Sequence, residues 1–200
     1  TRAHKLLHID SHDFTFGYSL NVGLQAASGK YAVIISAHML PVDEEWLGSL
    51  IRPLGDESTA SSYGRQMGWT TSKFGETQDL KRTFGTEPLV LRPPHFFGHN
   101  ANSAIRMDLW RQHPFDESLP GLEDIAWAKY WMLKGYTVAY APDAALHHIH
   151  EENWRQVRRR YYREAVAARR IGIKGRRHAL LDSVKEAGYA LQDLGLAIMP

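Results

Sequence analysis

The chain has 200 residues, of which 44% are hydrophobic, and this is enough for one packed domain of ordinary size. Cysteine is absent, which excludes disulfides and thiolate metal sites and fits a reducing compartment such as the cytoplasm, and no apolar run reaches the ~18 residues that a membrane span needs. The net charge is only +2, but ten Lys or Arg residues and one acid lie between Arg155 and Arg177, so the C-terminal part is strongly basic.

The first third of the chain alternates apolar runs with helical patterns. Three β-rich runs predict strands at 4–9, 31–37 and 59–67. Two amphipathic stretches predict helices: residues 18–27, which stop before Gly29, and residues 43–54, which Asp43 can cap. The run at 31–37 is continuously apolar, which is typical of a strand that is buried on both faces of a parallel sheet.

The rest of the chain continues this alternation. Residues 68–95 have mixed polarity and several Gly and Pro residues, which predicts a long loop with one short helix. Four segments follow: a strand that becomes a helix (102–113), a helix (122–136), one or two short strands (137–150) and a helix from Asn153 onward. Such alternation predicts an α/β fold, a mostly parallel sheet flanked by helices.

Ser36 and His38 lie at the carboxyl end of the strand predicted at 31–37, just before Pro41 turns the chain. In α/β sheets, ligands bind at the carboxyl ends of the strands. A small hydroxyl group and an imidazole are therefore expected where a ligand would lie.

Two adjacent carboxylates, Glu123 and Asp124, open the helix predicted at 122–136. Acidic residues in a first helical turn interact favourably with the helix dipole, so simple capping is one interpretation. The other is a general base, because a carboxylate beside a ligand crevice can accept a proton from a hydroxyl.

Histidines cluster in "HHIH" at 147–150. In an extended strand His148 and His150 point to the same side, and together with His38 they are candidate ligands of a divalent cation. The alternative is ordinary surface polarity.

The stretch "FFGHNANSAIR" (96–106) is rich in amide and hydroxyl side chains. Asn100, Asn102 and Ser103 suit hydrogen bonds with sugar hydroxyls, and Arg106 suits a phosphate or carboxylate. The same residues are also common in loops and in exposed ion pairs.

Together these stretches resemble the family 2 glycosyltransferases, which have the GT-A (Rossmann-like) fold. The match runs in order over roughly residues 4–171, and its motifs are "FTFGYSLNVGLQAASGKYAVIISAHMLPVDEEWLGSL", "NANSAIRMDLWRQHPFDESLPGLEDIAWA" and "GYTVAYAPDAALHHIH". The resemblance implies a transferase that moves a sugar, with inversion, from a nucleoside-diphosphate sugar to a hydroxyl of a saccharide or lipid-linked acceptor. It also suggests a role in bacterial polysaccharide or glycoconjugate synthesis.

The resemblance also implies roles for individual residues. Asp124 aligns with the catalytic base of the family, and Glu123 stands beside it. Two groups are assigned by the same comparison: Asn21, Ser36, His38 and Arg159 to the donor diphosphate, and Asn100, Asn102 and Arg106 to the acceptor. His148 matches a histidine that lies near the diphosphate or its metal in the family, with His150 as its neighbour.

The metal motif departs from the family. Ser36-Ala37-His38 stands where the family has Asp-x-Asp. Mg²⁺ prefers hard oxygen ligands, whereas His38 suits Mn²⁺ or another softer ion. A divalent cation, Mn²⁺ or Mg²⁺, is therefore one expectation, and diphosphate binding by His and Arg without a metal is the other.

The nucleotide half also departs from the family, because its first strands would precede Thr1, so we expect an N-terminally truncated chain. Residues 1–152 are predicted to form the GT-A-like domain, with a partial donor half (1–66) and an acceptor half (96–152), and residues 153–200 a basic helical extension. The alternative function is a non-catalytic protein that binds a saccharide or a partner. No nucleic-acid motif is present. The basic helix, interleaved with Trp154, suggests peripheral contact at the inner face of a membrane, or a solvated helix face.

Overall fold

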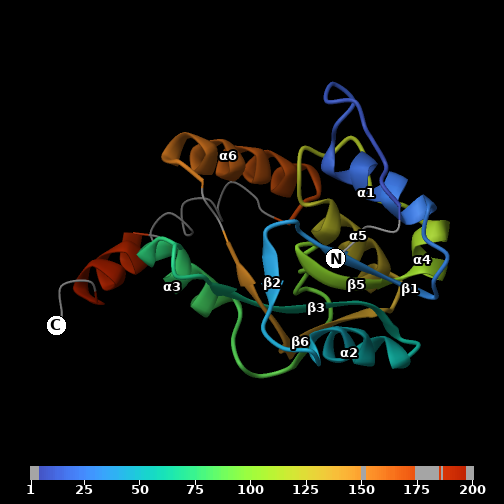
Figure 1. Ribbon diagram of the computed structural model, residues 1–200, viewed down its shortest axis with the longest axis horizontal. Coiled ribbons are helices and arrows are strands. Elements are labelled where there is room, and N and C mark those ends of the chain that lie inside the picture. Colours follow the sequence, from blue (N-terminus) through green and yellow to red (C-terminus); the bar gives the residue numbers. More distant parts are fainter. Residues whose placement is uncertain (1–4, 150–151, 174–184, 186, 197–200) are drawn as a thin grey trace.

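Two long strands form the centre of the fold, β3 (Thr59–Gly68) and β6 (Thr137–His148), and their buried side chains are mostly small or aromatic. The computed structural model describes residues 5–149, 152–173, 185 and 187–196. It contains one six-stranded sheet in the order β1-β5-β3-β6-β2, with β4 also paired to β6, and helices on both faces (Figure 1). The predicted α/β fold, a sheet flanked by helices, is confirmed.

The outer strands are short. They are β1 (Tyr31–Ile35), β2 (Met39–Pro41), β4 (Leu89–Leu91) and β5 (Asn102–Arg106). The prediction of a mostly parallel sheet is wrong: β3 and β6 form the one parallel pair in the described sheet, and the other four pairings are antiparallel. The reason is that β5 enters between β1 and β3 in the opposite direction. β1 is thus a strand at the end of the sheet with alternating burial, and it is not buried on both faces.

Strand direction places the candidate site. β1 and β3 both run antiparallel to β5, and β6 runs parallel to β3, so β1, β3 and β6 share one direction. Their carboxyl ends therefore meet at one edge of the sheet, as the sequence predicted for strands that carry ligand-binding residues.

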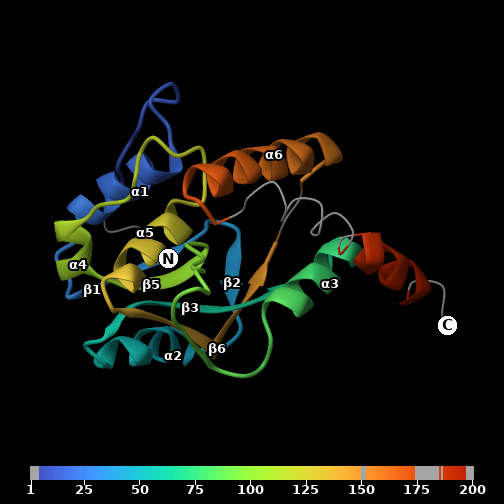
Figure 2. The ribbon, with the colours of Figure 1, turned by 180° about the vertical axis from the view of Figure 1, so that it is seen from behind.

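Helices cover the two faces of the sheet. On one face, α2 (Trp46–Ile51) and the 3-10 turn η1 (Arg52–Gly55) bury Leu50 and Leu54 against the sheet. On the other face lie α1 (Phe16–Gln25), α4 (Met107–Gln112) and α5 (Glu123–Leu133), whose aromatic side chains fill the larger core. Figure 2 shows the same two layers from behind.

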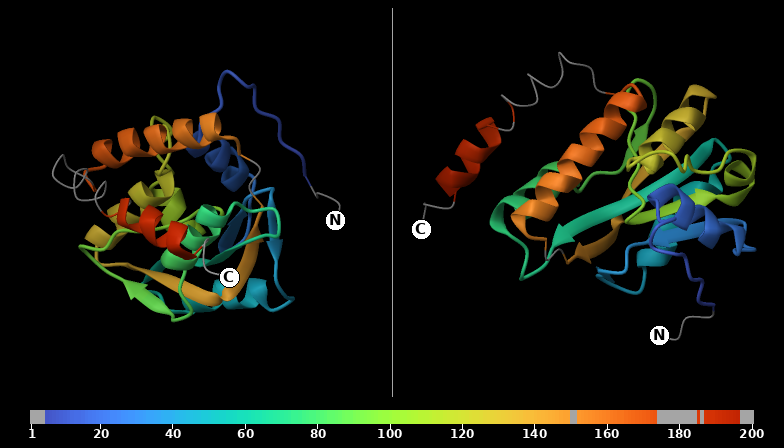
Figure 3. Two further views of the ribbon diagram at one scale, coloured as in Figure 1. Left: turned by 90° about the vertical axis from the view of Figure 1, so that its left-hand side faces the viewer. Right: turned by 90° about the horizontal axis from the view of Figure 1, so that it is seen from above.

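Two further helices follow the two long strands, and residues 187–196 are also helical. α3 (Phe74–Thr83) follows β3, and α6 (Trp154–Arg170) follows β6 and lies on the same side of the sheet as α5 (Figure 1 and Figure 3). A capping box at Asn153 starts α6, and this helix fits the prediction from the sequence. In the described part of the chain, no helix is long and apolar enough to cross a membrane.

Several details differ from the sequence predictions. Residues 5–9 form no strand, and the loop predicted at 68–95 contains β4 as well as α3. The helix predicted from Asp43 begins three residues later, because the Asp43 carboxylate accepts the N–H of Glu45 in a turn before the helix.

The pairing of β3 with β6 shifts register where β6 carries Pro142 and Asp143. The buried amide of Asn102 bridges this gap: its Nδ2 donates to the carbonyl oxygens of Ala144 (2.8 Å) and Arg65 (3.3 Å). Proline cannot donate to the ladder, so this side chain replaces hydrogen bonds that the backbone cannot make.

Gly64 lies beside this amide, and we expect Gly64→Ala to lower the free energy of unfolding by about 2–3 kcal/mol. A Cβ atom there would collide with the carbonyl oxygen of Ala144 and with Nδ2 of Asn102. Gly23→Ala, at an open position within α1, is the matched control and should raise stability by about 0.5–1 kcal/mol. Urea denaturation of both variants measures the difference, and equal stability of the two would contradict the role given to Gly64.

Candidate active site

Three strands that run in the same direction bring two histidines and a glutamine together. His38 lies in the turn after β1, Gln66 lies near the end of β3 and His148 is the last residue of β6. The Nε2 atoms of the two imidazoles are 2.9 Å apart, and the rings are stacked with centroids 4.9 Å apart. We call this arrangement the His38–His148 pair.

Gln66 selects the tautomer of His148. The Nδ1–H of His148 donates to Oε1 of Gln66 over 2.7 Å, so the neutral ring keeps a lone pair on Nε2, the atom that faces His38. A hydrogen bond at the far nitrogen, such as that of His148 with Gln66, is what orients histidines that bind metals. Ser36 Oγ lies near both ring nitrogens of His38, 3.2 Å from Nδ1 and 3.3 Å from Nε2.

The His38–His148 pair fits a divalent cation as two nitrogen ligands. Nitrogens 2.9 Å apart can both lie about 2.0–2.1 Å from one ion. The protein does not supply a third ligand from its described residues, because no group of three or more His, Cys, Asp or Glu side chains suited to a metal occurs among them. His150, the third predicted ligand, lies outside the described residues. Phosphate or water oxygens would have to complete the coordination.

Gln66 also offers a buried donor. Its side chain is 1% exposed, and no described residue accepts a hydrogen bond from its Nε2. An unpaired buried donor costs roughly 1–3 kcal/mol. A ligand oxygen next to the His38–His148 pair would remove that cost.

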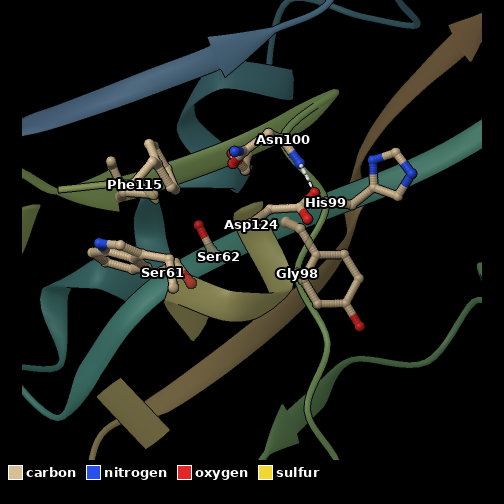
Figure 4. Close-up of a pocket in the computed structure, with 11 residues that line it drawn as sticks. Ser61, Ser62, Gly98, His99, Asn100, Phe115 and Asp124 are labelled. Atoms are coloured by element: carbon tan, nitrogen blue, oxygen red, sulfur yellow. Dashed lines mark hydrogen bonds between the residues drawn. The ribbon is translucent and has the colours of Figure 1, made fainter. Parts of the chain in front are cut away.

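Asp124 lies in the first turn of α5, where its carboxylate is held by two backbone groups. Oδ2 accepts the N–H of Asn100 (3.0 Å) and Oδ1 accepts the N–H of Ile125 (2.7 Å); Figure 4 shows the first of these bonds. Leu122, directly before the helix, has a left-handed backbone with φ of 58°, and this conformation sets the direction in which the helix begins.

The carboxylate of Asp124 lines a narrow pocket between α5, β3 and the loop before β5. About 10 Å³ of it is open to the centre of a water molecule, which is room for roughly one water. Other residues around it include Ser61, Ser62, Tyr63, Gly98, His99 and Asn100 (Figure 4). Apart from Asn100, the sequence assigned no role to these residues.

Burial raises the pKa of both carboxyl groups. The pKa of Glu123 rises to about 7, first because its side chain is only 6% exposed and second because of the charge on Asp124. The pKa of Asp124 rises to about 6, again mainly through burial, against the opposing effect of the N–H groups of Asn100 and Ile125. Both values lie in the range that suits proton transfer near neutral pH.

Helix α6 contributes charges to this pair. Glu164 raises the pKa of Asp124, and Arg163 lowers that of Glu123. The guanidinium of Arg163 also lies 4.6 Å from the centre of the Phe16 ring, which joins α6 to α1. No local pattern predicts these contacts, because α6 is 40 residues from the carboxylates and 147 from Phe16 along the chain.

One loop touches both polar clusters. The N–H of Asn100 holds Asp124, and the carbonyl oxygen of Ala101 accepts the N–H of Ser36, two residues before His38. However, His38 is not among the described residues that line the Asp124 pocket. The loop at Asn100 and Ala101 therefore contacts both Asp124 and the segment that carries His38, but only Asp124 lines the narrow pocket.

Asn21 does not face a donor pocket. Its Oδ1 accepts from Trp110 Nε1 (3.0 Å) and from the N–H of Phe115 (3.1 Å), and its Nδ2 donates to Phe115 O and to Glu117 Oε1 (both 2.9 Å). Every hydrogen-bonding group of this amide is used to hold α1 to the 113–117 segment. The donor assignment is therefore not supported.

The acceptor assignments of Asn102 and Arg106 are not supported either. Asn102 is fully buried, and its Oδ1 accepts from Trp46 Nε1 while its Nδ2 spans the register shift. Arg106 ends β5 at the opposite edge of the sheet, where its guanidinium forms two bonds with Asp108 (3.0 and 2.6 Å). Arg159 is exposed on α6.

The raised pKa of Glu123 predicts a change of stability with pH. Between about pH 4.5 and pH 7 the folded state binds the proton more tightly than the unfolded chain, so stability falls as pH rises through this window. Glu123→Gln should therefore stabilise the protein by about 2–3 kcal/mol at pH 8 and by almost nothing at pH 4. Thermal and urea unfolding across pH measure this, with exposed Glu44→Gln as control; a variant no more stable than the parent at pH 8 would refute the desolvation of Glu123.

Comparisons with known proteins support the fold. No protein-family model matches the chain, and no curated protein sequence matches it. Among solved structures, a mannosyltransferase from Pyrobaculum calidifontis in complex with GDP-Man and Mn²⁺ is similar, with a TM-score of 0.54 and 18% identity over 76% of this chain and 41% of that chain. S. aureus TarS 1–349 in complex with UDP-GlcNAc gives a TM-score of 0.51 and 14% identity over 66% of this chain and 38% of that chain.

The chain thus spans about two fifths of the length of these two proteins. At such low sequence identity the likeness concerns the fold alone. The chain therefore has a GT-A-like glycosyltransferase fold.

Proposed function

We propose that this chain is the catalytic part of a glycosyltransferase that moves a sugar from a nucleoside-diphosphate sugar to a hydroxyl acceptor with inversion. The observation that carries the proposal is the position of Asp124: a carboxylate with a pKa of about 6, held by backbone N–H groups in a narrow pocket. At neutral pH it is ionised and can take a proton from an incoming hydroxyl. The similar solved structures, one with GDP-Man and one with UDP-GlcNAc, make such a donor the natural choice.

In this mechanism the acceptor hydroxyl attacks the anomeric carbon from the side opposite the leaving diphosphate. Asp124 removes the hydroxyl proton as the new bond forms, and the N–H of Asn100 keeps Oδ2 in place. Glu123 acts as a positioning residue, because its partial negative charge and the nearby Asn100 amide (3.5 Å) shape the field at the pocket. Acceptor binding involves Asn100 and also His99 and Tyr63, which line the same pocket.

The His38–His148 pair is assigned to the donor diphosphate, with Ser36 and the unpaired amide donor of Gln66 beside it. A divalent cation bound by the two imidazoles would supply positive charge for the leaving diphosphate. Mn²⁺ suits imidazole nitrogen better than Mg²⁺ does. Arg159 is exposed on the side of α6 that faces away from the core, so it is left out of the donor site.

Two broader assignments rest on the ordered motifs and on composition. Membership of family 2, and a role in bacterial polysaccharide or glycoconjugate synthesis, follow from the resemblance of the motifs. A location in the cytoplasm is proposed because a chain without cysteine suits a reducing compartment.

A second candidate function is a non-catalytic protein that binds a saccharide or a partner. The narrowness of the Asp124 pocket favours it, because the described residues leave room there for roughly one water. Ser36-Ala37-His38 in place of two aspartates also favours it.

We expect Asp124→Asn to lower the rate of sugar transfer or donor hydrolysis by about 10²–10⁴-fold, because the amide cannot accept the proton. Turnover should be measured with UDP, GDP and dTDP sugars, with exposed Asp143→Asn as control. In the parent protein kcat/KM should rise with pH through about 6, where Asp124 ionises. Unchanged turnover in Asp124→Asn would refute the base, and saccharide binding without turnover in the parent protein would favour the second function.

We also expect His38→Ala and His148→Ala to weaken Mn²⁺ binding by at least about 10-fold in the presence of UDP or GDP. Free Mn²⁺ is counted by electron paramagnetic resonance, and exposed His12→Ala is the control. Gln66→Leu should weaken Mn²⁺ binding less, since Gln66 orients His148 but is not itself a ligand of the ion. Equal Mn²⁺ affinity in all four variants would rule out the metal assignment.

A further inference from the structure

The outward face of α6 combines arginines with aromatic residues. We call it the outer α6 face: Trp154, Arg155, Arg158, Arg159, Tyr161, Tyr162 and Arg169. All seven side chains are exposed, and Trp154 and Tyr162 are 77% and 74% exposed. Large aromatic side chains at such exposure are unusual on a helix that packs on a core.

Packing of the opposite side fixes the orientation of this face. Ala167 and Ala168 are buried, and the guanidinium of Arg163 lies on the Phe16 ring. At the helix end, Lys129 Nζ donates to Ile171 O (2.6 Å). The helix therefore cannot turn its aromatic residues inward without breaking these contacts.

The charge of α6 is one-sided. Between 154 and 170 there are seven arginines and one acid, Glu164. Glu164 is on the inner side of the helix, where it lies 4.0 Å from Arg160 and acts on Asp124. No acid is therefore present on the outer α6 face, and its four arginines are not neutralised within it.

Neighbouring segments add further basic and exposed aromatic side chains beside α6. Lys73 Nζ lies 5.3 Å from the centre of the Trp154 ring, and the next residue, Phe74, is exposed. Phe14 and Phe16, also exposed, form an edge-on ring pair beside Arg163. In Figure 3 α6 lies along one side of the molecule, with α2 on the far side of the sheet.

We propose that the outer α6 face binds the surface of an anionic lipid bilayer. Aromatic rings favour the boundary between headgroups and acyl chains, while arginines pair with lipid phosphates, and both lie on one rigid helix face. The surface charge would also suit nucleic acid, but the exposed rings at Trp154, Tyr161 and Tyr162 favour an apolar boundary. The proposal goes beyond the transferase function and does not depend on it.

The test is co-sedimentation of the full chain with vesicles of phosphatidylcholine alone or with 30 mol% phosphatidylglycerol. We expect binding only to the anionic vesicles, with loss in 1 M NaCl, where the Debye length falls from ~10 Å to ~3 Å. Replacing Arg155, Arg158 and Arg159 with Gln should weaken binding on the order of 100-fold, at about fivefold for each charge. Trp154→Ala with Tyr162→Ala should weaken it without changing its dependence on salt.

The matched control replaces three exposed arginines elsewhere, Arg52, Arg92 and Arg111, with Gln and should bind vesicles like the parent. Circular dichroism confirms that each variant is folded. Equal loss in the control would mean that general charge, and not this face, is responsible, and would overturn the proposal. Binding to a single- or double-stranded oligonucleotide but to no vesicle would overturn it in favour of nucleic acid, and binding to neither would leave a simply solvated helix.

Discussion

The buried amide of Asn102 is the interaction on which the geometry of the site depends. It joins β5 to the carbonyl oxygens of Arg65 and Ala144, where the β3–β6 pairing loses register. Beyond this point Gln66 is opposite Leu146, two residues before His148, so the His148 ring can donate to the Gln66 side chain. Backbone groups left unpaired at the shift would otherwise cost free energy, so a single polar side chain in the core makes the irregular strand possible.

A second constraint is the desolvation of two adjacent carboxylates. Glu123 and Asp124 are placed at a helix start with backbone N–H groups around them, yet burial still keeps both pKa values above their usual range. The site therefore gives up stability at neutral pH in return for a carboxylate that is ready to bind a proton. Glu164 and Arg163 from α6 adjust this balance in opposite directions, which links the basic helix to the chemistry of the pocket.

The sequence predicted much of the local structure and little of the pairing. Helical periodicity located α5 and α6, and the motif around Asp124 located the pocket. Strand direction could not be read, because β5 lies between β1 and β3 through contacts such as Ile35 with Asn102, which are far apart in the chain. For the same reason Asn21 was assigned to the donor and Asn102 to the acceptor, although both amides are used inside the fold. Gln66 went unnoticed although it orients His148.

The left-handed backbone at Leu122 determines how the two acidic side chains are aimed. An L-residue with a side chain in this conformation costs about 1–2 kcal/mol, which ordinary helical angles would recover. If the helix began one residue earlier, Leu122 would have helical angles and this cost would disappear. However, successive side chains of a helix differ in direction by about 100°, so a changed helix start would redirect the two carboxylates. A glycine at position 122 would relieve the strain. It would also let the backbone adopt more conformations, so the two carboxylates would be held less firmly in one direction.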